Sequence, residues 1–244
     1  MKQRLFAAIM GLLLMACPPV FAVEKALLDL SFEKKLQLAR AGDPEAKLAV
    51  AEAYQLGQGV HLNASEAAKW YREAALAGVL DAQFRLAKMV SAGAPGLKPD
   101  KDTAIKLLAA AAQKGHAPSQ NQYGFMLQTG DGVARDMKAA ADWYRQAAEQ
   151  GLAEAQNNLG VMLLNGWGVE RNLDDAFKWI SKSATQNYGW GLNNLGGLYE
   201  KGWGTPKDLK QAAYYYELAG NAGLPTGSKN FERLKSSAAS SVSP

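Results

Sequence analysis

Few residues of this chain have the type and spacing that catalysis or metal binding requires. The two histidines, His61 and His116, lie far apart in the sequence and lack the paired spacing of metal ligands. Ser31 and Lys34 match the Ser-x-x-Lys pattern of penicillin-binding enzymes, but no Ser-Asp-Asn or Lys-Thr-Gly sequence accompanies them. The single cysteine, Cys17, lies in an N-terminal segment that we expect to be cleaved or lipidated. We therefore predict no catalytic residues, no metal site and no cofactor.

The first 22 residues have the order of a secretory signal. Two basic residues precede an apolar run from Leu5 to Ala16, too short to span a bilayer, and small residues lead to a cleavage point after Ala22. A second route is open, because the Leu-Met-Ala-Cys sequence ending at Cys17 resembles the lipobox of bacterial lipoproteins. The leader would then end at residue 16, and Cys17 would carry the lipid. Both routes export the protein, so we predict a periplasmic location, with a lipid anchor at the outer membrane or secretion as alternatives.

The composition of the remaining chain argues against two classes of interaction. The sequence has 27 basic and 23 acidic residues, and two of the basic residues lie in the leader. A nucleic-acid-binding protein would show a stronger basic excess gathered on one face, so no nucleic-acid partner is expected. Beyond the leader, no apolar stretch is long enough for a transmembrane helix.

The elements that would position any functional side chain follow from an internal repeat. A glycine, or once an asparagine, recurs at intervals of 36 or 37 residues. These markers are Gly42, Gly78, Gly115, Gly151, Asn187 and Gly223. Both residue types tolerate the positive φ of a left-handed helix C-cap, so each marker should end one helix and lead into the next.

This spacing predicts a domain organisation of five helix-turn-helix repeats between two capping helices. The repeats are expected at 42–77, 78–114, 115–150, 151–186 and 187–222. An N-terminal capping helix is expected in 23–41. Residues 224–244 are expected to form a C-terminal capping helix and a disordered tail.

Each repeat sets a small residue of its first helix against large residues of its second helix. The small position holds Ala51, Ala87, Gly124, Gly160 and Gly196. The large doublet is Trp70-Tyr71, Leu107-Leu108, Trp143-Tyr144, Trp179-Ile180 and Tyr215-Tyr216. A small residue lets two backbones approach, and a large side chain fills the space beside it. The pattern predicts an all-α solenoid of stacked antiparallel helix pairs.

The turns between the paired helices carry two glycines around one variable residue in four of the repeats. They read Gly57-Gln58-Gly59, Gly130-Asp131-Gly132, Gly166-Trp167-Gly168 and Gly202-Trp203-Gly204, and an Asp or Asn follows before each second helix. They are not phosphate-binding loops, because no Lys-Ser/Thr follows and no strand precedes them. The second repeat departs from this pattern between Gly93 and Asp100, so we expect it to be the loosest point of the stack.

Three sequences in the third and fourth repeats resemble the Sel1-like repeat, a 36-residue relative of the tetratricopeptide repeat. They are Ala-Gln-Asn-Asn-Leu-Gly at 155–160, Gly-Trp-Gly-Val at 166–169 and Ala-x-x-Trp-Tyr-x-x-Ala-Ala-x-x-Gly at 140–151. The resemblance, which covers 42–223, implies a right-handed superhelix. First helices would line its concave face, and second helices would form the convex one.

The resemblance also implies a function. Exported bacterial members of the family usually act as adaptors in the cell envelope, so it implies a protein or peptide partner rather than an enzymatic activity. A cysteine-rich branch of the family is associated with β-lactam binding or hydrolysis and carries a cysteine pair in each repeat, which this chain lacks. A cell-wall or β-lactam-active hydrolase is therefore kept as the alternative function.

One candidate for partner contact is a polar position on the first helices. In successive repeats it is filled by Arg85, Gln122, Asn158 and Asn194. Stacked amides at one register would hydrogen-bond the backbone of an extended peptide. The other interpretation is that these amides bond to neighbouring helices and only tie the repeats together.

A second candidate is aromatic. Trp167 and Trp203 occupy the variable position of two consecutive turns, and Trp190 begins the first helix of the fifth repeat. Tryptophan is over-represented at interface hot spots, so we predict a partner site on repeats four and five. The alternative is that each indole packs against its own repeat.

Overall fold

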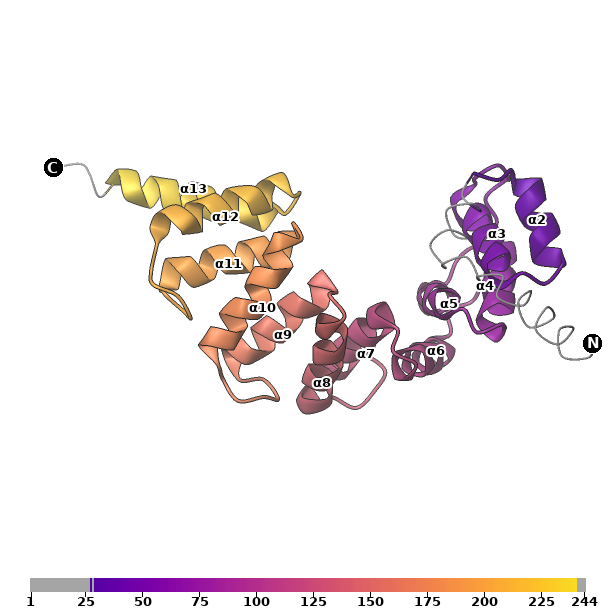
Figure 1. The fold of residues 1–244 in the computed structure, drawn as a ribbon, viewed down its shortest axis with the longest axis horizontal. Helices are drawn as coiled ribbons and strands as arrows, with labels where there is room; N and C mark the ends of the chain where they lie inside the picture. The colour runs from indigo at the N-terminus through magenta and orange to yellow at the C-terminus, as the bar shows by residue number, and fades with distance from the viewer. Residues whose placement is uncertain (1–26, 28, 241–244) are drawn as a thin grey trace, which may run out of the picture. The chain divides into compact units, whose positions relative to one another are not determined.

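The structure, a computed structural model, describes residue 27 and residues 29–240. The predicted leader, both of its alternative ends and the possible lipidation site Cys17 lie outside these residues, as do the last four residues of the chain. The described residues form twelve α-helices and no strand (Figure 1), and within each unit most consecutive helices pack against one another. The predicted all-α solenoid of helix-turn-helix repeats is thereby confirmed.

Each repeat contains two helices of 13 residues. The first helices are α3 (Pro44–Leu56), α5 (Leu80–Ala92), α7 (Ala117–Thr129), α9 (Ala153–Asn165) and α11 (Gly189–Lys201). The second helices are α4 (Ala64–Leu76), α6 (Lys101–Gln113), α8 (Met137–Glu149), α10 (Leu173–Thr185) and α12 (Leu209–Asn221). Helix α2 (Phe32–Arg40) precedes the repeats, and α13 (Pro225–Ser240) follows them.

The described chain divides into two units. The first contains the residues up to Ala82 together with Pro95–Leu97, and in it α3 packs between α2 and α4. The second contains Gln83–Ala94 and the residues from Lys98 onward, with α6 to α13 packed in sequence. The boundary falls in the second repeat, whose turn departs from the Gly-x-Gly pattern.

Side chains and glycines mark the helix ends where the sequence predicts turns. Each second helix begins at a carboxylate or amide that accepts a hydrogen bond from a backbone N–H of the first turn. These N-caps are Asn63, Asp100, Asp136, Asn172 and Asp208. Asn187 has a φ of 59° and is the one non-glycine residue with a positive φ in the described part of the chain. Asn187 adopts the left-handed conformation that the glycine markers adopt in the other repeats, as predicted from its place in the series.

The second glycine of the turn lets one repeat dock on the preceding one. A Cβ added to Gly168 would lie 2.2 Å from the carbonyl oxygen of Met137, at the start of α8. A Cβ added to Gly204 would lie 2.2 Å from the carbonyl oxygen of Leu173, at the start of α10. Any side chain at these positions would collide with backbone, and their positive φ also favours glycine.

The small position of the first helix is the point of closest approach within a repeat. A Cβ on Gly160 would lie 2.5 Å from Cγ1 of Ile180 and 3.2 Å from the carbonyl oxygen of Ala176. Ile180 is fully buried. Gly124 faces the ring of Tyr144 in the same way, at 3.1 Å. The predicted pairing of small against large residues is therefore what brings the helices together.

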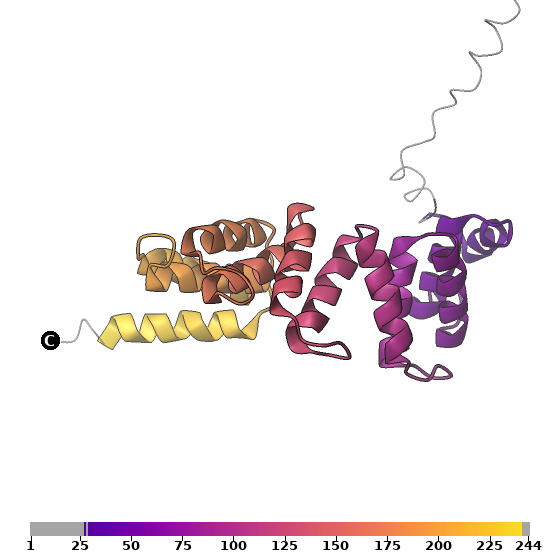
Figure 2. The ribbon, with the colours of Figure 1, turned by 90° about the horizontal axis from the view of Figure 1, so that it is seen from below.

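Helix α13 occupies the place that the first helix of a further repeat would take. It packs against α12 and also contacts α11 (Figure 2). The amide of Asn230 donates to Asn193 Oδ1 at 2.9 Å, and Arg233 donates to Glu200 Oε2 at 2.7 Å. The bond from Arg233 is the main reason that the pKa of Glu200 lies below its usual range. The outward side chains of α13 are largely polar, as a solenoid end requires.

The replacement Gly160→Leu tests the helix register. The added side chain has no room beside Ile180 and the carbonyl oxygen of Ala176, so we expect a loss of about 1–3 kcal/mol in the free energy of unfolding, measured by urea titration. Gly197→Ala is the matched control. The atom nearest to a Cβ at Gly197 is the Tyr216 hydroxyl oxygen, at 3.6 Å, so this change should be neutral or stabilising. Wild-type stability in the Gly160→Leu variant would show that the register is wrong.

Candidate interaction site

Asparagine side chains link successive first helices of the second unit in a ladder. Asn158 donates to Asn121 Oδ1 at 3.0 Å. Asn194 donates to Asn157 Oδ1 at 2.8 Å, and the bond from Asn230 to Asn193 continues the series into α13. The two partners of each bond are 37 residues apart. The three accepting side chains are each less than 10% exposed, so a bond of this kind satisfies the carbonyl oxygen of a buried side chain.

The ladder shows where two amides of the predicted polar position donate. Asn158 and Asn194, predicted as partner-binding residues, direct their amide nitrogens to the neighbouring helix. These two donors tie repeats together. Contact of the same side chains with a partner through other atoms stays a prediction.

The ladder stops at Gln122. The residue that would accept its amide, at the position of Asn121 one repeat earlier, is Phe84, which has no acceptor. No described residue hydrogen-bonds the side chain of Gln122. Arg85, at the same register in the second repeat, is half-buried on α5.

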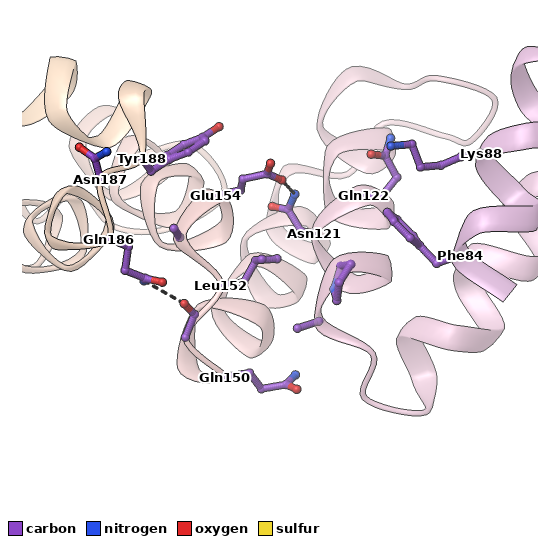
Figure 3. A pocket seen from close by; sticks show the side chains of 14 residues that line it. Phe84, Lys88, Asn121, Gln122, Gln150, Leu152, Glu154, Gln186, Asn187 and Tyr188 are labelled. Carbon is purple, nitrogen blue, oxygen red and sulfur yellow. Dashed lines mark hydrogen bonds between the residues drawn. The ribbon is translucent and has the colours of Figure 1, made fainter. Parts of the chain in front are cut away.

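Gln122 lines a cavity of about 890 Å³ in the second unit (Figure 3). Phe84 and Lys88 of α5 form one side of the cavity. The first turns of α7 and α9 and the segment before α11 form the rest. The remaining lining residues are Ala117, Pro118, Asn121, Gln150, Gly151, Leu152, Ala153, Glu154, Gln186, Asn187 and Tyr188.

Three side chains of the cavity have acceptor oxygens with bonding capacity to spare. Gln150 and Gln186 use their amide nitrogens to bond the buried Gln120 and Gln156, at 2.7 and 2.8 Å, and no described residue donates to their carbonyl oxygens. Glu154 Oε2 accepts from Asn121 at 3.2 Å. A ligand that carries hydrogen-bond donors therefore finds acceptors in this cavity.

The five repeats match a known family model. The model, described as the Sel1 repeat, matches residues 44–79, 80–116, 117–152, 153–188 and 191–224. The chain belongs to the Sel1 repeat family. Four of the five matched Sel1 units begin where a first helix begins, just after the glycine marker.

Solved structures of Sel1 repeat proteins share this fold. A protective antigen of uropathogenic Escherichia coli with an SLR fold is 30% identical, with a TM-score of 0.75 over 83% of this chain. This chain spans only 43% of that antigen. A Sel1 repeat protein of Oxalobacter formigenes is 28% identical, with a TM-score of 0.74 over 82% of this chain and 86% of that protein. An immunity protein of Pseudomonas aeruginosa is 22% identical and has a TM-score of 0.52, over 80% of this chain and 74% of its own, which shows the fold alone.

The three predicted tryptophans do not form one site with the cavity. Trp167 and Trp190 are 42% and 48% exposed. Trp203 is half-buried and packs against a core cluster that the fourth and fifth repeats share, and its ring centre lies 4.1 Å from the ammonium of Lys201. None of the three lines the cavity, and their contact with a partner stays a prediction.

The residues suited to catalysis have structural roles. The Ser31 hydroxyl caps α2 by accepting from the backbone N–H of Lys34 at 3.4 Å. The Lys34 ammonium donates to Gln37 instead of approaching Ser31. His116 lies 2.8 Å from the Ser119 hydroxyl at the start of α7.

The described residues lack two further features, a metal-binding cluster and a membrane-spanning helix. They contain no group of three His, Cys, Asp or Glu side chains placed to hold a metal ion. They also contain no helix that combines the length and the apolar character needed to cross a membrane.

Asn194→Ala and Gln122→Ala test the ladder at one register. Loss of the Asn194 amide leaves the buried carbonyl of Asn157 without its donor, so we expect a cost of about 1–3 kcal/mol in the free energy of unfolding. Gln122→Ala removes no bond between repeats and should change that free energy by less than about 0.5 kcal/mol. Chemical denaturation of both variants measures the difference. Equal costs would contradict the ladder.

Proposed function

We propose that this Sel1 repeat protein is a non-catalytic adaptor that binds an extended segment of a partner protein on its first-helix face. One observation carries the proposal. Gln122 keeps a free amide inside a cavity, whereas the amides at the same register in the next two repeats are used between helices. An amide side chain can donate to a peptide carbonyl and accept from a peptide N–H at once.

The Sel1 repeat fold supports this proposal in general terms, because stacked helix pairs present a long surface suited to protein partners. The size of the cavity is also appropriate. About 890 Å³ lies within the range of well-formed ligand sites. The cavity draws residues from several helices, so a bound segment would cross repeats rather than enter one of them.

The exposed tryptophans offer a second contact region on repeats four and five. Trp190 occupies the position of Glu154 one repeat later, and therefore continues the row of first-helix residues that includes a cavity residue. Trp167 lies in the turn that follows α9, at the other end of this helix from Glu154. Trp203 belongs to this contact region by its position in the second Gly-Trp-Gly turn.

We further propose that the adaptor works in the bacterial cell envelope. The support is the order of charged, apolar and small residues in the first 22 positions. Periplasmic release after Ala22 is favoured, and lipid attachment at Cys17 is the alternative. Mass spectrometry of the mature N-terminus separates the two routes.

Site-specific photocrosslinking tests the proposal in cells. A benzophenone amino acid in place of Gln122 should form a discrete adduct with a partner protein, because its side chain enters the cavity. The same amino acid in place of Lys178, an exposed residue of the second helix α10, is the control and should not form this adduct. Absence of an adduct at Gln122, or the same adduct at both positions, would count against the cavity.

The aromatic region is tested in the same cells. The double replacement Trp167→Ala/Trp203→Ala should lower recovery of the Gln122 adduct, because tryptophans commonly supply much of the binding energy of an interface. Helicity measured by circular dichroism should be unchanged. Undiminished recovery with normal helicity would remove these tryptophans from the site.

A further inference from the structure

The cavity is lined by one acidic and one basic side chain, which project from different helices (Figure 3). Lys88 projects from α5 and sits 5.5 Å from the centre of the Phe84 ring. Glu154 projects from α9, with Asn121 and Gln122 lying between the two charges in the view. A ligand that lies along the stretch between these two residues therefore meets a negative charge at one end of the stretch and a positive charge at the other.

The Glu154 carboxylate has unused bonding capacity. Its one hydrogen bond from a described residue comes from the Asn121 amide, to Oε2. No cation in the described residues forms an ion pair with it, although the ammonium and guanidinium groups elsewhere on the helices often pair with neighbouring acids. A carboxylate can accept at several positions on its two oxygens, so Oε1 and part of Oε2 are open to a donor.

The surroundings of Glu154 suit a cationic side chain. Tyr188 lines the same end of the cavity and is half-buried. Burial raises the pKa of its hydroxyl, and the nearby Glu154 charge raises it further, which places the two groups within electrostatic reach. An aromatic ring beside a carboxylate is a favourable environment for a guanidinium, which stacks on the ring while it donates to the acid. The carbonyl oxygen of Gln186 is a further acceptor on this side.

We propose that the cavity recognises a basic side chain, arginine in preference to lysine, within an extended peptide segment of the partner. The guanidinium pairs with Glu154 and lies against Tyr188, and the Gln122 amide bonds a peptide group of the same segment. This inference rests on the proposed function and names the chemistry of the partner. Arginine is favoured because its planar fork can donate to the carboxylate and to a neighbouring carbonyl together.

The positive charge of Lys88 favours one of the two orientations in which a peptide could bind. Its positive charge disfavours a second basic residue at the Phe84 end of the cavity and favours an acidic one there. An acidic side chain at the other end would face the Glu154 carboxylate and be rejected. The charge order of the cavity thus predicts a charge order in the ligand.

Selection from a random heptapeptide phage library tests this directly, with the purified chain as bait. Peptides retained by the wild-type protein should be enriched in arginine, and to a lesser degree in lysine. The most enriched peptide, labelled and titrated by fluorescence anisotropy, should bind Glu154→Gln at least about tenfold more weakly, because a charge-assisted pair is lost. Selection on Glu154→Lys should switch the enrichment to Asp and Glu.

Two controls separate a binding effect from a general one. Glu149→Gln changes the net charge by the same amount at an exposed residue of α8 outside the cavity, and should leave the affinity unchanged. Tyr188→Phe should bind as wild type, whereas Tyr188→Ala should bind severalfold more weakly. Glu154 is itself exposed, and circular dichroism should show that its variants keep their helicity.

The outcomes distinguish this inference from the proposed function. Enriched peptides without a basic residue, or peptides that bind Glu154→Gln as well as wild type, would overturn the inference. Such peptides would still support the proposed function, because the protein would bind them. Failure to enrich any peptide would overturn both.

Discussion

The close approach of two helix backbones at one small residue is the constraint on which the rest of this structure depends. At Gly160 and Gly124 the facing side chain of the second helix occupies the space that a Cβ would need. These helix pairs are thereby held at one spacing, and the second glycine of the turn lets the fourth and fifth pairs pack closely on the preceding pair. First helices set at a regular spacing bring equivalent residues of successive repeats into line. Only then can side chains 37 residues apart form the same hydrogen bond again and again.

In the third to fifth repeats, a tyrosine of the second helix and its hydrogen-bond acceptor on the first helix are either both present or both absent. The Tyr144 hydroxyl donates to Gln128, and the Tyr216 hydroxyl donates to Glu200, both at 2.7 Å. In the fourth repeat Ile180 takes the tyrosine position, and the residue at the acceptor position is Leu164, which packs in the same cluster. Donor and acceptor are lost together, because either one alone would leave a buried polar group unsatisfied.

The asparagine ladder ends at Phe84 without such a paired loss of donor and acceptor. Here the acceptor of the ladder is lost, but Gln122 keeps its amide. The unmatched amide does not carry a large penalty, because it faces a cavity where water or a ligand can bond it. The same substitution that weakens the link between two repeats thus leaves a polar group available for recognition.

The repeat count, the small positions and the turns could all be predicted from the sequence, because each depends on neighbouring residues or on a strict period. The direction of the Asn158 and Asn194 amides could not, since it depends on which residue of the preceding helix lies opposite. The adjacent pairs Asn157-Asn158 and Asn193-Asn194 were the available signal, together with Phe84 where the series breaks. Trp167 and Trp203 show the same limit. They share the Gly-Trp-Gly sequence, but Trp203 packs against a core cluster shared by the fourth and fifth repeats, and Trp167 is more exposed.

Proton exchange of the assigned side-chain amides, measured by NMR, tests the central claim most directly. The account predicts slow exchange for the amide protons of Asn158 and Asn194, which are bound between helices. It predicts fast exchange for Gln122, close to that of the exposed turn residue Gln58. Exchange at Gln122 as slow as at Asn194 would show that the ladder does not end there, and would contradict the account.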